Sequence, residues 1–184
     1  MNTTIPAAAE IDLARWVRPG DTLMWGQAGA EPLTLVRALA EQRQNFARTR
    51  VFLGVGHAGL LRAEHADAID LLAYCGSGSN RQLADAGVLD IWPGRYSALP
   101  AAIRGGPLRI DVLLLQVSPP DAQGRHSLGL AQEYLLAALD SFMRGAQIDL
   151  GLAGASDPVE EVIGGCRIMT SEGVEDFLEG NILL

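Results

Sequence analysis

A short apolar run that ends at two adjacent prolines constrains the fold more than any other stretch of this sequence. Residues 111–117 read Asp-Val-Leu-Leu-Leu-Gln-Val, which is too short for an ordinary helix and is typical of a strand buried on both faces. Pro119 and Pro120 stop the strand, because proline fixes φ and cannot donate to a sheet ladder. Asp121 and Gly124 suit a tight turn. The pattern predicts a rigid loop at the carboxyl end of a central strand, the edge where open α/β sheets bind ligands.

The chain before this run alternates between strand and helix patterns. Residues 21–25 predict a strand, 26–30 a glycine-containing loop, 31–48 a helix beginning at Glu31-Pro32, and 50–55 a second strand. Such a βαβ unit implies parallel pairing. Further strands are expected at 69–74, 88–91, 148–152 and 166–169, and helices at 11–17, 80–86, 97–103, 132–143 and 172–179, with another helix start at 156–158. We therefore predict an α/β fold with a mainly parallel open sheet flanked by helices.

Composition narrows the functional classes. The 184 residues are 48% hydrophobic, which is enough for one domain with a core, or for one domain and part of another. The net charge of −8 argues against nucleic-acid or anionic-membrane partners. All 14 basic residues are arginines, so Schiff-base and P-loop lysine chemistry is excluded. Cys75 and Cys166 are interpreted as reduced thiols of a cytoplasmic protein, and neither a signal peptide nor a membrane span is expected.

The segment from Asp111 to Gly129 resembles the signature of the acetyl-CoA hydrolase / 4-hydroxybutyrate CoA-transferase family. It combines the strand, the Pro-Pro turn and Ser127-Leu128-Gly129, and Tyr134 follows. Residues 19–21 and 26–32 resemble the family's first strand, loop and helix. The residues that resemble the family's middle section are Asn80, Arg81, Ala84, Gly87, Pro93, Ser97 and Pro100. The similar segments span residues 15–144, which the resemblance assigns to the family's N-terminal domain and to its CoA-transferase-like fold.

The tail resembles the opening of the family's C-terminal domain, at residues 150–159 and 169–174. Family members carry a long connection between the two parts, whereas residues 145–149 are all that separates them here. We therefore predict a CoA-transferase-like N-terminal domain over 1–144 and a shortened remnant of the C-terminal domain over 145–184, packed on the first. A truncated relative, a cut piece and an internally shortened form remain open. An apolar face left by the shortening would favour a homo-oligomer or a partner subunit.

The resemblance implies a glutamate nucleophile, whose carboxylate attacks an acyl-CoA thioester and becomes a glutamyl-CoA thioester. The family places it just before a Met-x-Ser-Asp/Glu-Gly-Val run, and that place holds Ile168 here. A hydrocarbon side chain cannot attack a thioester. Glu172 is the nearest carboxylate and the candidate catalytic residue, with the first turn of a helix as its structural alternative. Cys166 is a conceivable thiol nucleophile, although a buried strand cysteine is the simpler interpretation.

Two loops and one glycine supply the candidate substrate-binding residues. The first loop lies before a helix N-terminus, where N–H groups can hold a carboxylate, a phosphate or a thioester oxyanion; an ordinary βα turn is the alternative. The second loop, Ser118 to Gly124, can shape an acyl pocket or can simply end a strand. For Asp121 the strand-ending turn is the favoured interpretation. No Gly-x-Ser-x-Gly surrounds Ser118, so it is not interpreted as a hydrolase nucleophile. The candidates are Gly26, Gln27, Ala28 and Gly29; Ser118, Pro119, Pro120 and Gln123; and Gly151.

No metal site is expected, because His57, His65 and His126 lack zinc-ligand spacing. The glycines at 76–79 and 105–106 match no phosphate-loop motif. The predicted function is a CoA-transferase or acyl-CoA hydrolase of acetate metabolism. It would act on a short-chain acyl-CoA such as acetyl-CoA and a small carboxylate, with little or no activity as this isolated chain. No cofactor is expected to be permanently bound, since the CoA thioester is a substrate. The alternatives are a non-catalytic remnant that binds a CoA ligand or a partner, and one subunit of a split CoA-transferase.

Overall fold

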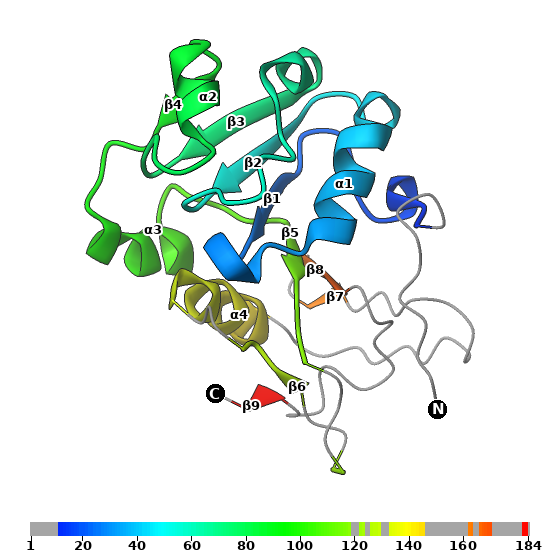
Figure 1. Cartoon of the computed structure of the whole chain (residues 1–184). Helices are drawn as coiled ribbons and strands as arrows, with labels where there is room; N and C mark the ends of the chain where they lie inside the picture. Colours follow the sequence, from blue (N-terminus) through cyan, green and yellow to red (C-terminus); the bar gives the residue numbers. More distant parts are fainter. Residues whose placement is uncertain are drawn as a thin grey trace.

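A computed structural model describes residues 11–118, 122–123, 126–129, 133–145, 162–163, 166–170 and 182–183. Within these residues, seven strands form one sheet in the order β4-β3-β2-β1-β5-β8-β7 (Figure 1). All neighbours pair in parallel except β7, which is antiparallel to β8. The predicted mainly parallel α/β fold is confirmed. The strands are β1 (Thr22–Trp25), β2 (Thr49–Leu53), β3 (Ile69–Ala73), β4 (Leu89–Ile91), β5 (Val112–Leu115), β7 (Val162–Ile163) and β8 (Cys166–Thr170), with a separate parallel pair β6 (His126–Ser127) and β9 (Ile182–Leu183).

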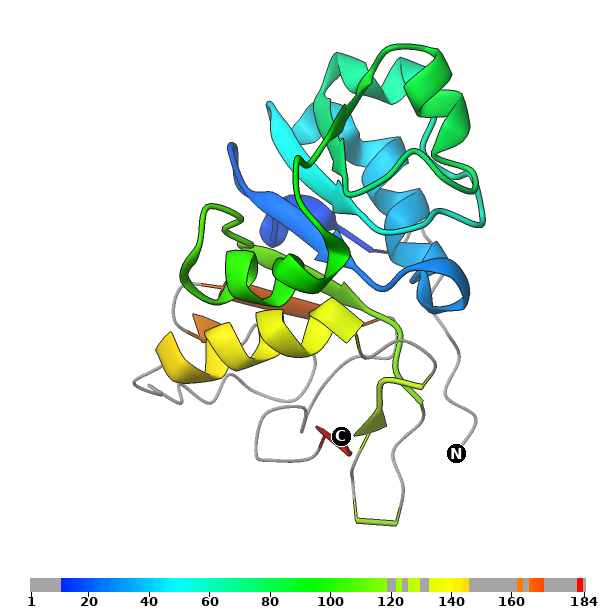
Figure 2. The same cartoon turned by 90° about the vertical axis from the view of Figure 1, so that its left-hand side faces the viewer.

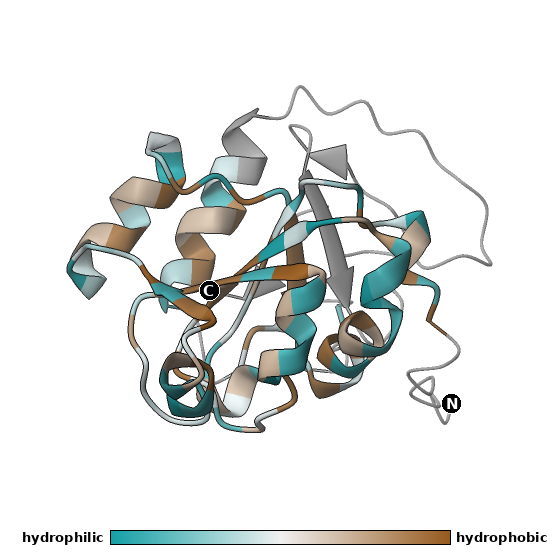
Figure 3. Cartoon of the chain, turned by 90° about the horizontal axis from the view of Figure 1, so that it is seen from above, coloured by the Kyte–Doolittle hydropathy of each residue, from teal (hydrophilic) through white to brown (hydrophobic). Residues whose placement is uncertain are grey.

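Helices cover both faces of the sheet. On one face lie α1 (Leu33–Gln42), α2 (Arg81–Asp85) and a 3-10 turn at Leu13–Arg15. On the other, α3 (Leu99–Gly105) and α4 (Glu133–Gly145) run side by side (Figure 2). Successive strand residues serve the two cores in turn, so that Leu23 packs under α1 and Met24 under α3 and α4. The helices alternate between hydrophilic and hydrophobic residues, as expected for elements with one face in water (Figure 3).

The strand order reverses between β1 and β5. From β1 the chain proceeds outwards through β2, β3 and β4, and then returns to place β5 on the other side of β1. Trp25 at the end of β1 is in register with Leu114. The helix that follows β1 covers one face and α4, which follows β5, covers the other. Such a reversal leaves a crevice at the carboxyl ends of the two strands, where open α/β sheets bind ligands.

Several predicted boundaries are wrong. The helix expected over 31–48 begins at Leu33, ends at Gln42 and continues as a 3-10 turn over Arg43–Asn45, and Ala47 then has φ 54°, which no helix accommodates. The strand expected over 111–117 is confined to Val112–Leu115, and the helix at 11–17 is the single 3-10 turn. The three two-residue strands β6, β7 and β9 were not expected. The elements expected at 148–152, 156–158 and 172–179 lie outside the described residues.

The second predicted unit contributes to the same sheet as the first. β8 pairs with β5 along four residues, and Leu113 is in register with Ile168. The division at residue 144 stays a prediction, but residues 166–170 continue the sheet of residues 22–115. No helix in the described part of the chain has both the length and the apolarity needed to cross a bilayer.

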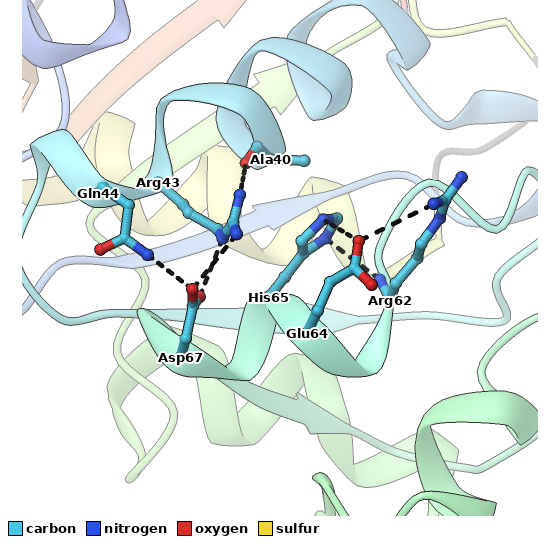
Figure 4. A network of polar contacts seen from close by, with 7 residues as sticks. All are labelled: Ala40, Arg43, Gln44, Arg62, Glu64, His65 and Asp67. Carbon is cyan, nitrogen blue, oxygen red and sulfur yellow. Dashed lines mark hydrogen bonds and ion pairs between the residues drawn. The ribbon is translucent and has the colours of Figure 1, made fainter.

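A polar network ties α1 to the 3-10 helix before β3, Ala63–Asp67 (Figure 4). Arg43 makes a bidentate pair with Asp67, with Nε–Oδ1 2.9 Å and Nη2–Oδ2 3.2 Å, and also donates to the Ala40 carbonyl. His65 is 8% exposed, and its Nδ1 accepts the backbone N–H of Arg62 at 3.2 Å. An accepting Nδ1 carries no proton, so this geometry holds the imidazole neutral.

The network predicts a pH dependence of stability. Burial, reinforced by the charge of Arg43, lowers the pKa of His65 below its ordinary value. The folded chain therefore binds a proton less readily than the unfolded chain. The stabilisation is complete above the unfolded pKa of about 6.5 and is lost as the pH falls through the folded pKa. Urea midpoints should fall between pH 7 and pH 5 in the wild type, and less steeply in His65→Asn. His57→Asn, at an exposed histidine, is the control; equal pH slopes for wild type and His65→Asn would contradict the assignment.

Candidate functional site

The two loops singled out in the sequence follow neighbouring strands. Gly26 to Gly29 come directly after β1, and Ser118 comes three residues after β5. Because β1 and β5 are parallel and adjacent, both loops leave the same edge of the sheet at its strand-order reversal. Gln123 is exposed. The other candidates, Pro119, Pro120, Gly151 and Glu172, lie outside the described residues, as do Asp121 and Gly124.

The loop after β1 is ordered by its own hydrogen bonds. Ala28–Ala30 form a 3-10 turn, and Ala28 has φ 50°. The Ala28 N–H donates to the Val55 carbonyl at 2.9 Å, and the Ala30 N–H to the Gln27 carbonyl at 3.0 Å. Two of the N–H groups considered for anion binding therefore already have partners inside the protein, and the anion-binding prediction now rests on Gly26, Gln27 and Gly29.

Gln27 is the centre of this edge. Its Oε1 accepts from the Val55 N–H at 3.0 Å and from the Tyr74 hydroxyl at 2.7 Å, and its Nε2 donates to Glu133 Oε2 at 2.5 Å. One side chain thus connects the segments that follow β1, β2 and β3 with the start of α4. The donor that the sequence suggested for substrate is directed at Glu133.

All three tyrosines of the chain gather at the same place. The rings of Tyr74 and Tyr96 lie edge to face with centroids 5.0 Å apart, and those of Tyr96 and Tyr134 at 6.3 Å. Tyr134 is 2% exposed and donates to the Trp25 carbonyl at 3.2 Å. Tyr96 is 41% exposed, and after burial the Glu133 carboxylate is what raises the pKa of its hydroxyl. The cluster therefore combines a carboxylate with phenol and amide donors at the carboxyl edge of the sheet.

The tyrosines remain protonated at physiological pH. Burial raises the pKa of Tyr74 to about 12. Burial likewise raises the pKa of Tyr134 well above its ordinary value, and the pKa of Tyr96 is raised by burial and then by the Glu133 carboxylate. Each hydroxyl is consequently a hydrogen-bond donor and not a base.

Sequence reasoning missed this cluster. A signal was present for Gln27 and Tyr74, because Gln27 follows the predicted strand 21–25, Tyr74 is the last residue of the predicted strand 69–74, and parallel strands end at one edge. Glu133 and Tyr134 follow the Ser127-Leu128-Gly129 motif, although nothing in the sequence joins them to Gln27. Tyr96 gave no signal, since its position depends on the return of the chain from β4 to β5.

A second group of polar contacts fixes the loop after β2. The Glu31 carboxylate accepts the N–H groups of His57 at 3.3 Å and Ala58 at 2.8 Å. Asn80 is 3% exposed, and its Nδ2 donates to the Gly54 carbonyl at 2.6 Å. Glu31 and Asn80 line a small hollow beside Trp25 at the same edge. The residues that resemble the family at positions 31 and 80 thus have structural roles.

Ser118 closes the Pro-Pro loop. Its N–H donates to the Ser127 carbonyl at 2.9 Å, and its Oγ accepts the Ser127 N–H at 3.0 Å. Ser127 Oγ in turn accepts the Gly129 N–H at 3.1 Å. These contacts explain why the serines of the motif stand where they do, and they agree with the decision not to interpret Ser118 as a nucleophile.

The position expected for a glutamate nucleophile lies within a strand. Ile168 is the third of the five residues of β8, in register with Leu113. β8 ends at Thr170, at the same edge as Gln27 because it is parallel to β5. In the sequence Glu172 comes two residues later.

The Gln27–Glu133 contact predicts a charge dependence. Gln27→Glu should retain the acceptor for Val55 and Tyr74 but set a carboxylate against Glu133. The lost donor should cost about 1 kcal/mol in the free energy of unfolding at pH 7. Adding Glu133→Gln should recover most of the loss, because the new amide at position 133 can donate to the new carboxylate at position 27. A urea-unfolding double-mutant cycle measures this. Additive losses would show that the two side chains do not interact.

No family model matches the chain. Known proteins are similar to it in sequence in one case and in fold in others. The 4-hydroxybutyrate coenzyme A transferase of Clostridium kluyveri is 27% identical over 126 residues, which are 65% of this chain and 28% of that protein. RipA from Yersinia pestis has a similar fold with a TM-score of 0.60 and 25% identity, over 70% of this chain and 32% of RipA. A substituted form of RipA gives a TM-score of 0.65 at 24% identity, over 74% and 33%. The chain therefore spans about a third or less of the length of these relatives.

Proposed function

We propose that this chain handles a short-chain acyl-CoA thioester such as acetyl-CoA, because it is 27% identical over 126 residues to a 4-hydroxybutyrate coenzyme A transferase. The thioester would lie at the carboxyl edge of β1 and β5, and the second substrate would be a small carboxylate, or water in a hydrolase. The observation that carries the proposal is the convergence of the two resemblance loops at this edge. CoA would be a substrate and not a permanently bound cofactor.

The edge offers what thioester chemistry needs. Attack on the thioester carbonyl develops negative charge on its oxygen, and N–H donors placed there stabilise that charge. The N–H groups of Gly26, Gln27 and Gly29 are our candidates for this role. Ser118, Pro119, Pro120 and Gln123 would border the acyl group, and Gly151 would contact the CoA portion. A cytoplasmic location and a homo-oligomer are part of the same proposal.

A transferase mechanism requires a catalytic carboxylate. With Ile168 at the expected position, transfer would require another glutamate in this chain, for which Glu172 is the candidate, or a glutamate supplied by a partner subunit. The occupation of position 168 by isoleucine favours a second function, in which the chain binds a CoA ligand or a partner without turnover. The two functions differ in whether CoA exchange occurs.

The test is exchange of labelled acetate into acetyl-CoA by the purified chain, with calorimetric titration of acetyl-CoA in parallel. Exchange that Glu172→Gln abolishes and Glu41→Gln preserves would support a transferase with Glu172 as its nucleophile. Glu41 is an exposed carboxylate in the last turn of α1 and serves as the matched control. Saturable binding without turnover supports the binding function, and exchange that appears only with a candidate partner supports a split enzyme. Absence of both binding and turnover would reject the proposal.

A further inference from the structure

We propose that Glu133 is the reactive carboxylate of this chain. It would act as a general base for water and make the chain an acyl-CoA hydrolase. This inference rests on the proposed function, because it assumes that the thioester lies at the carboxyl edge of β1 and β5. It selects hydrolysis over transfer and assigns a residue to it.

The position of Glu133 suits a base. It is exposed, so water can reach its carboxylate, and it begins α4 next to the loop that follows β1. The Gln27 amide, on the loop after β1, holds one carboxylate oxygen at 2.5 Å. This donor orients the carboxylate, as the third member of a catalytic triad orients its base.

The neighbouring residues fix the direction in which the Gln27 amide points. Tyr74 donates to the Oε1 of Gln27, which leaves the Nε2 of that amide directed at Glu133. Tyr134 lies behind the pair and donates to the Trp25 carbonyl. Glu31, the other carboxylate near this edge, accepts the backbone N–H groups of His57 and Ala58. Among the described residues, Glu133 is therefore the carboxylate at this edge that is exposed to solvent and is oriented by a side chain.

The backbone of Glu133 adds to this picture. Its φ is 26°, an uncommon value for a residue with a Cβ atom. Such conformations cost free energy, persist only where the surrounding contacts enforce them, and gather at functional sites. Here the hydrogen bond from Gln27 is the contact that holds the side chain at the edge.

Hydrolysis requires no covalent carrier of CoA. The oxygen of water forms a bond to the thioester carbonyl carbon while one of its protons passes to Glu133. The carbon–sulfur bond then breaks, and CoA leaves as a thiolate, which takes the proton from Glu133. The new carboxylic acid loses its own proton to solvent. The products are a carboxylate, CoA thiol and one proton, and Glu133 is regenerated. A hydrocarbon side chain at position 168 is compatible with this route, whereas a glutamyl-CoA carrier at that position is not.

The experiment measures thiol release from acetyl-CoA by the full chain, with binding followed by calorimetry. Glu133→Gln is expected to lower kcat at least 100-fold with unchanged acetyl-CoA affinity, since general bases contribute factors of about 10²–10⁴. Glu41→Gln, on the far end of α1, should retain wild-type kcat. Glu133→Asp keeps a carboxylate but draws it back by one methylene, and it should lower kcat by less than Glu133→Gln does.

The outcomes separate this inference from the function on which it rests. A wild type that does not bind acetyl-CoA rejects the proposed function itself. A wild type that binds acetyl-CoA without hydrolysing it, or a Glu133→Gln variant that hydrolyses as fast as wild type, overturns the role of Glu133 alone. Trapping of a glutamyl-CoA thioester with borohydride would overturn it as well. Should Glu133→Gln fail to fold, Glu133→Asp decides, and a kcat equal to that of wild type counts against the base.

Discussion

Replacing Gly54 with alanine is expected to destabilise the chain by about 1–3 kcal/mol, the usual cost of overpacking a filled site. A Cβ at this position would lie 2.3 Å from the Tyr134 hydroxyl oxygen and 2.4 Å from the Cβ of Gln27. Neither neighbour can withdraw freely, because Tyr134 is 2% exposed and Gln27 is held by Val55, Tyr74 and Glu133. The substitution should therefore also disturb the tyrosine cluster.

Urea unfolding followed by circular dichroism measures the effect of Gly54→Ala, and the near-ultraviolet tyrosine signal reports on the cluster. Gly105→Ala is the matched control. No other group lies within 4 Å of a Cβ at that position, and Gly105 is the last residue of α3, where alanine is tolerated. Equal unfolding midpoints for the two variants would show that the edge is packed more loosely than its contacts indicate.

The largest loss of stability is expected from Tyr134→Ala, at about 3–5 kcal/mol, the range for removing a buried aromatic ring. The Tyr134 ring meets Phe52 edge to face at 5.9 Å and Tyr96 at 6.3 Å, so its removal leaves a cavity beneath α4. A domain of this size has about 5–15 kcal/mol of stability in total, so the variant should be partly unfolded in mild denaturant.

Tyr134→Phe separates packing from hydrogen bonding. It keeps the ring and loses the 3.2 Å bond to the Trp25 carbonyl, which should cost about 1 kcal/mol. Thermal melts of the two variants against wild type make the comparison. If Phe were as damaging as Ala, the hydroxyl and not the ring would hold α4 on the sheet.

The edge of the sheet was predictable because its determinants are local. The apolar run before Pro119 fixes a strand, and Gly26 to Pro32 fix a turn between a strand and a helix. The start of β5 is not local in origin: Asp111 pairs with Arg109 at 2.8 Å beside it, but it also accepts the Thr22 N–H at 3.0 Å from 89 residues earlier in the chain. Two parallel strands that end in loops were enough to place the candidate site at one edge.

Element lengths were less predictable, because propensity alone does not end a helix. Residues 43–48 continue the apolar and polar pattern of α1, yet the chain must turn there to bring Thr49 to the start of β2. Arg43 then bonds Asp67 and the Ala40 carbonyl, contacts that a single helix through residue 48 would not make. Tertiary pairing outweighed the local preference.

The sequence by itself determined the α/β class, the parallel sheet and the edge at which the candidate loops lie, because hydrophobic period and turn chemistry act over a few residues. Only the tertiary structure decided that Gln27, Tyr74, Tyr96 and Glu133 lie together. The strand order β4-β3-β2-β1-β5 brings residues 27 and 133 to the same edge, and no local pattern in the sequence does so. A hydrogen bond between groups 106 residues apart depends on how the whole sheet is wound, and this physical reason places the candidate base beyond the reach of sequence reading.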